Sequence, residues 1–545
     1  MSLNPILAIV LCGLAAPAPL TAQDTVAATV AELIATARAP WARWPDFAGY
    51  VDEVKQLYEV SPATTIWHDG SWLSPKGKSA IAALLTASEH GLDSDDYDVE
   101  LLERLARESV STPLSAVDRA RFDLLLTVDL MRFLDDLQTG RLHRHLLPSS
   151  GAAEPALDLA AALRGALAGD SLPGLIAGLA PQLAQYRNLQ RALTRYRQFA
   201  SDTSLRLVPT RGPILPGDTS PHGTRLRRFL VAIGDLDPTA AAAGSPIYSA
   251  PEVEAMRRFQ LRHGLQPTGA VDSATMKELS TPLSWRVRQI ELALERLKWL
   301  PPIGQRPFLV VNIPAFQLFA FDSAGGAGAP ALTMRVIVGK ALDKQTPVLL
   351  ETLRYVEFRP AWNVPRSILV EEIVPLLKQD PGYLRRNNME IVGPRDRVIR
   401  SVALDDLLDR LTRGELRLRQ RPGAGNPLGL TKFVFPNAAN VYLHGTPQTD
   451  LFAPARRDFS HGCVRIEDPA ALAEWVLRDQ RSWPLDSILA AQRAKATTRA
   501  LLTRPMPVII FYTTAVATPD GRLYFYPDVY GHDRNLEEAL RAGPT

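Results

Sequence analysis

Two short segments of the chain contain residue types that together can perform nucleophilic catalysis. Residues 441–446 read Val-Tyr-Leu-His-Gly-Thr, and residues 460–465 read Ser-His-Gly-Cys-Val-Arg. Cys463 is one of two cysteines, and the other, Cys12, lies in a predicted export signal. A lone thiol in an exported protein cannot close an intramolecular disulfide, so its place beside histidine and glycine suggests chemistry. The sequence therefore predicts a cysteine enzyme that works outside the cytoplasm.

A cysteine nucleophile needs a base, because a thiol of ordinary pKa, about 8.5, is mostly protonated at neutral pH. His444 is the preferred base, since it ends a strand-like run and can face a cysteine that arrives from another strand. The carbonyl of Gly445 could fix the tautomer of the His444 ring. His461 lies two positions before Cys463, so extended backbone would turn both side chains to one face. We therefore expect His461 to support the catalytic pair.

The same segments offer groups that could bind the substrate. The amide N–H groups of Gly462 and Cys463 could stabilise a developing oxyanion, and the hydroxyl of Tyr442 could add a third donor. Arg465 suits a substrate carboxylate, which a guanidinium grips with two parallel hydrogen bonds. A packed tyrosine and a structural ion pair explain Tyr442 and Arg465 equally well. Trp362, directly before a predicted insertion, is a further candidate for substrate binding.

These two motifs resemble those of the L,D-transpeptidases with a YkuD-type catalytic domain, especially the large YcbB-like members. The family signature is a His-Gly pair, a gap of about this length, and then Ser/Thr-His-Gly-Cys-x-Arg. The resemblance implies that the Cys463 thiolate attacks the third residue of a peptidoglycan stem peptide, expels the terminal D-alanine and forms a thioester. An amine of a second stem peptide then completes a 3→3 cross-link. The resemblance also implies acylation by carbapenems. Peptidoglycan synthases are candidate partners, although the sequence does not say whether one takes part, and no cofactor is expected.

Other functions stay open at this stage. Water in place of the amine would make the protein an L,D-carboxypeptidase, and a protein acceptor would make it an enzyme that attaches proteins to peptidoglycan. A wall-binding protein without catalysis is a third alternative. Zinc binding by His444, His461 and Cys463 is disfavoured because zinc needs three or four ligands and paired ligand spacing is missing from the sequence. Papain-like and NlpC-like peptidases usually place the cysteine before the histidine, the reverse of the order here.

The elements that would position this chemistry suggest a multidomain α+β protein. We expect a signal peptide at 1–23, a helical scaffold domain at 24–207, and a linker with a peptidoglycan-binding-like domain at 208–285. The catalytic domain is expected at 286–545 with an insertion at about 368–426. In the scaffold, apolar residues recur at helical spacing, as in Leu124, Val128, Met131 and Leu134.

The small middle domain resembles the three-helix peptidoglycan-binding domain. Its expected helices are 252–263 and 273–279, joined by a turn and capped by Asp272 or Ser273. Most of the matching residues also suit core or turn positions, so glycan binding is open. The residues that match the pattern are Ala255, Phe259, Gln260, Gly264, Leu265, Thr268, Gly269, Val271 and Asp272.

The catalytic region is predicted to be mainly β. Strand-like runs occur at 308–313, 317–321, 333–338 and 349–358, and the runs 508–516 and 522–525 flank a Thr-Pro-Asp-Gly turn as a predicted hairpin. A helix after Asp468-Pro469 is expected from the N-cap and the following proline. The charged, helix-prone insertion could act as a lid over a cleft, or it could be a surface excursion.

Composition and charge limit the remaining function classes. The chain has 545 residues, of which 46% are hydrophobic and 22% charged, as in ordinary globular proteins. The net charge of +3 arises from 61 basic and 58 acidic residues, a balance that disfavours nucleic-acid binding. Residues 1–23 lack charged side chains and contain an apolar run followed by small residues, which predicts an exported, periplasmic protein. An uncleaved membrane anchor is the alternative.

Overall fold

The computed structural model describes residues 21–60, 65–142, 157–169, 171–206, 212–219, 223–241, 246–304, 306–323 and 329–543. The chain divides into two compact units, each described here by itself. The first unit comprises 1–88, 93–136 and 156–179, and the second comprises 89–92, 137–155 and 180–545. Of the predicted signal peptide only residues 21–23 are described, and Thr21 caps helix α1 with a capping box. Within the described ranges, no helix is both long enough and apolar enough to cross a membrane.

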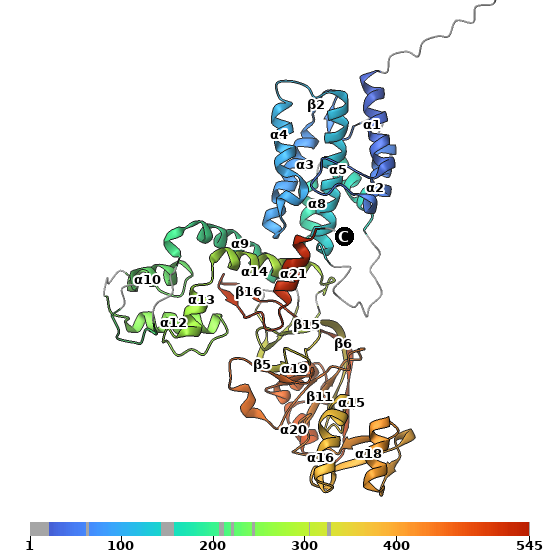
Figure 1. The fold of residues 1–545 in the computed structure, drawn as a ribbon, viewed down its shortest axis with the longest axis vertical. Helices are drawn as coiled ribbons and strands as arrows, with labels where there is room; N and C mark the ends of the chain where they lie inside the picture. Colours follow the sequence, from blue (N-terminus) through green and yellow to red (C-terminus); the bar gives the residue numbers. More distant parts are fainter. Residues whose placement is uncertain are drawn as a thin grey trace, which may run out of the picture. The chain divides into compact units, whose positions relative to one another are not determined.

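The first unit is helical, as the sequence predicts. Its long central helix α5 buries the predicted stripe of Leu124, Val128, Met131 and Leu134 completely or almost completely. The elements of this unit, drawn in blue to cyan in Figure 1, are α1 (Ala22–Thr36), η1 (Ala48–Tyr50), α2 (Val51–Val60), β1 (His68–Asp69), β2 (Trp72–Leu73), α3 (Pro75–Leu85), η2 (Thr86–His90), η3 (Ser94–Tyr97), α4 (Val99–Glu108), α5 (Ala116–Thr139), α7 (Leu159–Ala168) and α8 (Leu172–Leu179).

A buried carboxylate organises the centre of this unit. Asp123 accepts hydrogen bonds from the backbone N–H of Trp67 at 2.9 Å and from the hydroxyl of Tyr58 at 2.8 Å. Nδ1 of His68 lies 3.0 Å from the same carboxylate. Because a buried charge needs several partners, His68 serves here as one of the partners of Asp123.

The second unit begins with helices that include the peptidoglycan-binding-like fold. They are α9 (Ala184–Ser201), η4 (Thr203–Leu205), α10 (Gly223–Ala232), α11 (Pro238–Ala241), α12 (Ala250–Arg262), α13 (Ser273–Leu279) and α14 (Leu283–Lys298). Asp272 caps α13 by accepting from the N–H of Thr275 at 2.8 Å, as predicted. The motif residue Gln260 is buried between α12 and the following turn. Its amide donates to the Ala270 carbonyl and accepts from the Gly269 N–H, both at 2.8 Å, so it fixes the turn.

Part of the predicted linker belongs to this domain. Ile214 forms a bridge with Val271, and its side chain is buried in the same apolar core as Phe259. Residues 212–219 are therefore attached to this domain by backbone bridges at Ile214 and Thr219, although only Ile214 is buried. Residues 208–211 and 220–222 of the predicted linker lie outside the described ranges.

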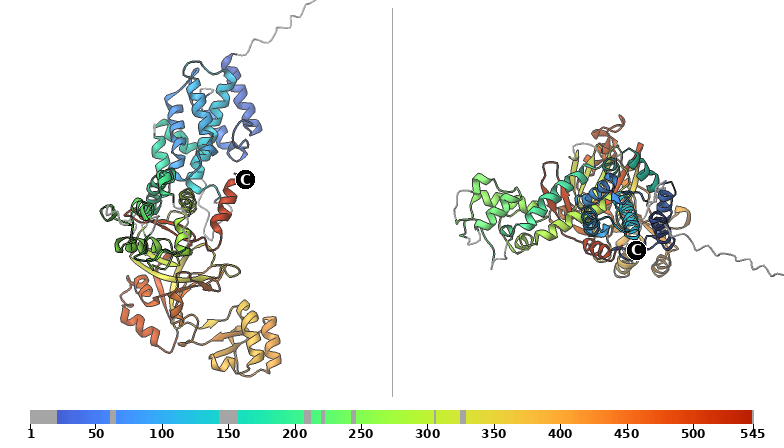
Figure 2. Two further views of the ribbon diagram at one scale, coloured as in Figure 1. Left: turned by 60° about the vertical axis from the view of Figure 1, so that its left-hand side comes forward. Right: turned by 90° about the horizontal axis from the view of Figure 1, so that it is seen from above.

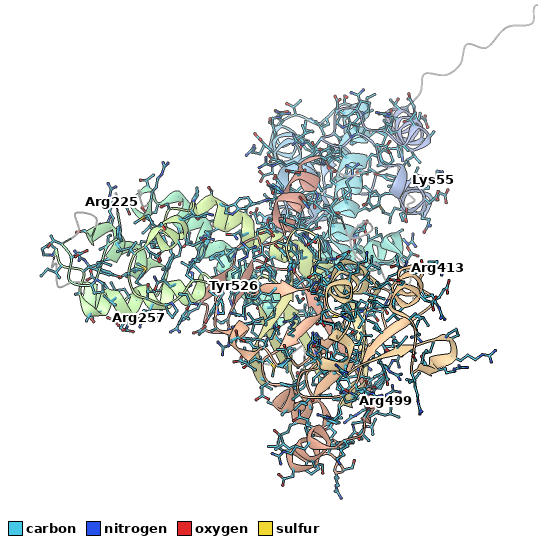
Figure 3. The ribbon with its side chains drawn as sticks, turned by 60° about the horizontal axis from the view of Figure 1, so that its bottom comes forward. Lys55, Arg225, Arg257, Arg413, Arg499 and Tyr526 are labelled. Carbon is cyan, nitrogen blue, oxygen red and sulfur yellow. The ribbon has the colours of Figure 1, made fainter. Side chains whose placement is uncertain are left out.

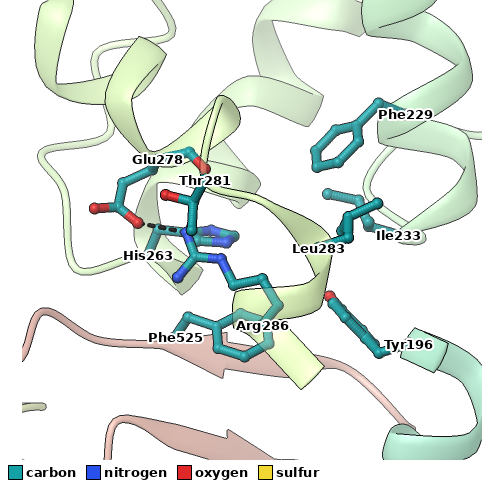
Figure 4. Close-up of a pocket in the computed structure, with 9 residues that line it drawn as sticks. All are labelled: Tyr196, Phe229, Ile233, His263, Glu278, Thr281, Leu283, Arg286 and Phe525. Atoms are coloured by element: carbon teal, nitrogen blue, oxygen red, sulfur yellow. Dashed lines mark hydrogen bonds and ion pairs between the residues drawn. The ribbon is translucent and has the colours of Figure 1, made fainter. Parts of the chain in front are cut away.

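A small pocket lies where this domain meets a hairpin of the catalytic region (Figure 4). Its free volume of about 10 Å³ is close to the minimum for one water molecule, too little for a sugar or a peptide. The guanidinium of Arg286 lies 4.8 Å from the centre of the Phe525 ring and forms an ion pair with Glu278. Burial lowers the pKa of His263 well below its usual value, so this ring packs as a neutral group. The pocket is a packed joint between domains.

The catalytic region is built on a sheet that closes on itself. Its strands are β3 (Phe308–Asn312), β4 (Gln317–Phe321), β5 (Leu332–Gly339), β6 (Leu349–Phe358), β11 (Thr431–Val434), β12 (Leu443–His444), β13 (Asp458–Ser460), β14 (Val464–Ile466) and β15 (Thr498–Phe511). The order is β13-β5-β14-β12-β11-β6-β15-β3-β4, and β4 also pairs with β5. The four predicted strand runs before residue 360 are confirmed as β3 to β6, with small shifts at their ends.

Short helices and a hairpin complete the catalytic region. They are η7 (Thr449–Phe452), α19 (Pro469–Leu477), α20 (Leu485–Arg493), β16 (Ala515–Ala517), β17 (Leu523–Phe525) and α21 (His532–Arg541). Asp468 caps α19 as predicted, accepting from the N–H of Ala471 at 2.9 Å. The predicted hairpin exists, but its first strand is shorter than expected. The run 508–516 is divided, because residues up to Phe511 continue β15 and only β16 pairs with β17.

The insertion has an apolar core of its own. Leu369, Leu377, Leu411 and Leu418 are among its buried residues. It contains strands as well as the predicted helices, and these strands form a sheet in the order β7-β10-β8-β9. Figures 1 and 2 show its elements gathered as a group, coloured yellow to orange. The elements are β7 (Trp362–Asn363), α15 (Arg366–Ile368), the π-helix η5 (Leu369–Ile373), α16 (Val374–Gln379), α17 (Tyr383–Arg386), β8 (Met389–Val392), η6 (Pro394–Asp396), β9 (Val398–Ile399), α18 (Leu404–Arg413) and β10 (Arg417–Gln420).

Candidate active site

Two neighbouring parallel strands bring the sequence motifs together. Leu443 of β12 pairs with Val464 of β14, and the register continues from His444 to Arg465. Leu443 and Val464 are completely buried in the core of the catalytic region. Because side chains alternate along a strand, the flanking residues Tyr442, His444, Cys463 and Arg465 share the opposite face. The polar groups of both motifs therefore gather on one side of the sheet.

His444 is held as a buried, neutral ring. Its Nδ1 lies 2.5 Å from the carbonyl oxygen of Gly445, so Nδ1–H donates to that carbonyl and Nε2 keeps the lone pair. The side chain is 4% exposed, and burial lowers its pKa to about 3. The cations Arg465 and Lys432 lower this pKa further, while the hydrogen bond to Gly445 raises it. The imidazole is consequently unprotonated and able to accept a proton throughout the physiological range.

Cys463 carries a free, partly exposed thiol directly before β14. Burial raises the pKa of this thiol, whereas hydrogen bonds from Tyr442 and the positive charges of Lys432 and Arg465 lower it. Its Sγ lies 3.9 Å from the carbonyl oxygen of Asn440. The raised thiol pKa and the lowered imidazole pKa leave the thiol of Cys463 and the ring of His444 both neutral at rest.

The backbone before Cys463 is fixed by two hydroxyl groups. Gly462 has a φ of +116°, a conformation that favours glycine, and its N–H donates to Ser460 Oγ at 3.1 Å. Its carbonyl accepts from Thr346 Oγ1 at 2.8 Å, which orients the Cys463 N–H because both belong to one peptide plane. In this conformation the Gly462 N–H donates to Ser460, so its expected oxyanion role stays a prediction. The Cys463 N–H is the better candidate.

Thr346 is the buried residue of the loop between β5 and β6. Its side chain is fully buried, and Oγ1 also accepts from the Gly339 N–H at 2.8 Å. The hydroxyl of Tyr530 donates to the Gly339 carbonyl at 2.6 Å and accepts from the Thr346 N–H at 3.2 Å. This network connects the end of β5 to the peptide bond before the nucleophile.

The other predicted site residues contact different groups: Tyr442 contacts Cys463, Arg465 contacts Gln448, and Trp362 packs in the insertion. Tyr442 forms a hydrogen bond with Cys463, and burial together with the negative charge of the sulfur raises the pKa of its hydroxyl. Arg465 donates from Nη1 to Gln448 Oε1 at 2.8 Å. Trp362 lies on β7, opposite Gln420 of β10, and packs against the apolar core of the insertion.

His461 connects the nucleophile loop to the insertion. Its Nε2 lies 2.7 Å from Glu372 Oε1 on the π-helix η5. The preceding residue, Glu371, accepts from Lys344 Nζ at 2.8 Å, and Lys344 belongs to the loop that ends at Thr346. The loop that carries His461 and the loop that carries Lys344 therefore both bind η5 of the insertion, through Glu372 and Glu371.

Comparison with known proteins assigns the domains. Residues 306–510 match the model of the L,D-transpeptidase catalytic domain, YkuD. The chain carries an L,D-transpeptidase catalytic domain. Residues 52–193 match a scaffold domain, and residues 225–279 match a domain provisionally described as peptidoglycan binding. The resemblance predicted from the two sequence motifs is thereby confirmed.

Two relatives illustrate the extent of the likeness. A curated protein of Haemophilus influenzae, provisionally named an L,D-transpeptidase, is 32% identical over 253 residues. The match covers 46% of this chain, and the chain spans only about half (49%) of that relative. The crystal structure of an L,D-transpeptidase from Xylanimonas cellulosilytica is matched over its whole length and 56% of this chain, with 15% identity. Its TM-score of 0.17 is too low to support any argument.

Lys432 and Thr346 of the L,D-transpeptidase domain did not emerge from the sequence. Thr346 lies 116 residues before Gly462, and only the folded loop brings the two together. The sequence contains only a weak signal for Lys432. It is a single lysine within a strand, and its two neighbours in the chain, Thr431 and Phe433, are buried. In the described ranges no cluster of three or more His, Cys, Asp or Glu side chains is arranged to hold a metal ion.

Proposed function

We propose that the protein is a peptidoglycan L,D-transpeptidase that forms 3→3 cross-links through a thioester on Cys463. The observation that supports this most strongly is the shared face of β12 and β14. It presents Cys463 together with His444, whose tautomer is set by the Gly445 carbonyl. The match to the catalytic domain supports acyl transfer, and the match to a peptidoglycan-binding domain supports the substrate class.

The first half of the reaction acylates the enzyme. The sulfur of Cys463 bonds to the carbonyl carbon of the third stem-peptide residue while its proton moves to Nε2 of His444. The Cys463 N–H and the Tyr442 hydroxyl donate to the oxyanion of the tetrahedral intermediate. When the intermediate collapses, the C–N bond to the terminal D-alanine breaks, and the leaving nitrogen takes the proton from His444. A thioester remains on Cys463.

The second half transfers the acyl group. The side-chain amine of a second stem peptide bonds to the thioester carbon, and His444 accepts a proton from this nitrogen. The C–S bond then breaks, and the sulfur recovers its proton from His444. The guanidinium of Arg465 is the nearest candidate for a substrate carboxylate, and Trp362 is a candidate contact at the insertion. Peptidoglycan synthases would supply new strands as partners in the periplasm, where the exported protein would act.

Products distinguish this proposal from its alternatives. The full-length protein is incubated with disaccharide tetrapeptides, and the products are separated and weighed by mass spectrometry. We expect cross-linked tetrapeptide–tripeptide dimers with release of D-alanine. Tripeptide monomers alone, with ¹⁸O incorporated from labelled water, would instead identify a carboxypeptidase. Unchanged substrate beside measurable binding to wall sacculi would favour the non-catalytic alternative.

A further inference from the structure

A row of polar side chains crosses the sheet next to the nucleophile. Each strand contributes one residue, because the pairing keeps them in register: Arg465 on β14, His444 on β12, Lys432 on β11, Glu357 on β6 and Arg499 on β15. Adjacent strands are about 4.8 Å apart, so each group lies within electrostatic reach of the next. Lys432 occupies the position next to His444.

Glu357 and Arg499, at one end of the row, form an ion pair with each other. Arg499, labelled in Figure 3, donates from Nε to Glu357 Oε2 at 2.6 Å, and its side chain is 62% exposed. The side chain of Lys432 is directed toward Tyr442 instead. Its ammonium lies 3.7 Å from the centre of the Tyr442 ring, the geometry of a close cation–π contact. The positive charge is thereby directed toward the side of the row that holds Cys463.

We propose that Lys432 is a positioning residue that supplies the fixed positive charge for the anionic sulfur of Cys463, acting through Tyr442 and through its own field. The ammonium on the ring face holds the phenol in place and makes its hydroxyl a stronger donor. The effect of Lys432 on catalysis rests on the proposed function, the acyl transfer through Cys463. Because His444 is neutral at rest, it offers the sulfur no positive charge before the proton moves, whereas the Lys432 ammonium is already in place.

The charged surroundings are consistent with this assignment. Burial lowers the pKa of Lys432, whereas the Glu357 carboxylate and the Cys463 sulfur both raise it. The other positive charges of the row are Arg499 on β15 and Arg465 on β14. Arg465 also lowers the pKa of the Cys463 thiol. Removing the Lys432 charge should therefore raise the thiol pKa, and the reactivity profile should move to higher pH.

The test measures the reactivity of Cys463 directly. Full-length wild type and Lys432→Met are treated with iodoacetamide between pH 6 and 10, and alkylation of the Cys463 peptide is quantified by mass spectrometry. We expect Lys432→Met to shift the apparent thiol pKa upward by about one unit, so that alkylation near neutral pH slows about tenfold. Lys432→Arg, which keeps the charge, should recover most of the wild-type profile.

Matched variants separate charge from folding. Arg257, labelled in Figure 3, lies on α12 and pairs with Glu254. Arg257→Met removes one positive charge there and should leave the profile unchanged. Thermal unfolding identifies any loss of structure, and if Lys432→Met does not fold, Lys432→Gln replaces it. A Lys432→Met profile that superimposes on the wild type would overturn the proposal. Alkylation needs no turnover, so a shift without cross-linking would refute the proposed function and leave this inference standing.

Discussion

Replacing His444 by Gln is expected to slow acylation of Cys463 by a carbapenem by about 10²- to 10⁴-fold, the usual contribution of a positioned general base. Glutamine keeps the size and polarity of the side chain but cannot accept the thiol proton. Because burial holds the pKa of His444 at about 3, the wild-type base stays neutral above about pH 4. The acylation rate constant, followed by the change in β-lactam absorbance, measures the effect.

The pH dependence of the same variant gives an independent signature. In the wild type the rate should be nearly constant between pH 5 and pH 8, because neither the neutral imidazole nor the neutral thiol titrates there. In His444→Gln the thiol must ionise by itself, so the rate should rise about tenfold for each pH unit below the thiol pKa.

His461→Gln is the matched control for this prediction. The ring of His461 pairs with Glu372 of the insertion, so its loss should slow acylation by less than about tenfold. If His461→Gln were as slow as His444→Gln, or if the wild-type rate fell steeply below pH 7, His444 would not be the neutral base described above.

Gly339→Ala is expected to destabilise the fold by about 1–3 kcal/mol and to slow acylation at least tenfold. A Cβ at this position would overlap the carbonyl oxygen of Lys344 and lie 2.8 Å from the Thr346 nitrogen. The loop must move, and with it the Thr346 hydroxyl that orients the Gly462 carbonyl. Thermal unfolding and acylation kinetics of the purified variant measure the two effects.

Gly425→Ala provides the control for a glycine in open surroundings. A Cβ added there meets no heavy atom within 4 Å, so stability and acylation should stay near those of the wild type. Equal behaviour of the two variants would show that the loop beside β5 does not position the nucleophile.

The sequence was sufficient for the features that depend on short-range patterns. The helical stripe in α5, the N-caps Asp272 and Asp468, and the strands β3 to β6 follow from spacing and from capping chemistry, which are local. The two motifs also identify Cys463 and His444 as candidates, because a lone thiol beside histidine and glycine suggests chemistry. Such features can be identified before the chain is folded.

Other features depend on which strands become neighbours, and single-sequence patterns do not contain that information. Lys432 reaches the site only through the register of β11 with β12, and Thr346 only through the packing of a distant loop. The engagement of the Gly462 N–H by Ser460 is a matter of local backbone torsion that the motif alone does not specify. The strands inside the insertion, β8 to β10, were missed because segments of two to four residues are too short to show a strand pattern.

The most direct test of the central claim is the intact mass of the full-length protein after incubation with a carbapenem, measured beside Cys463→Ala. The thiol on the shared face of β12 and β14 should attack the lactam carbonyl, so the wild type should gain the mass of one inhibitor molecule and the variant should gain none. Tandem mass spectrometry should place the adduct on Cys463. An adduct of equal yield on Cys463→Ala, or an unmodified wild type with a free thiol, would contradict the account of Cys463 as the acylated nucleophile.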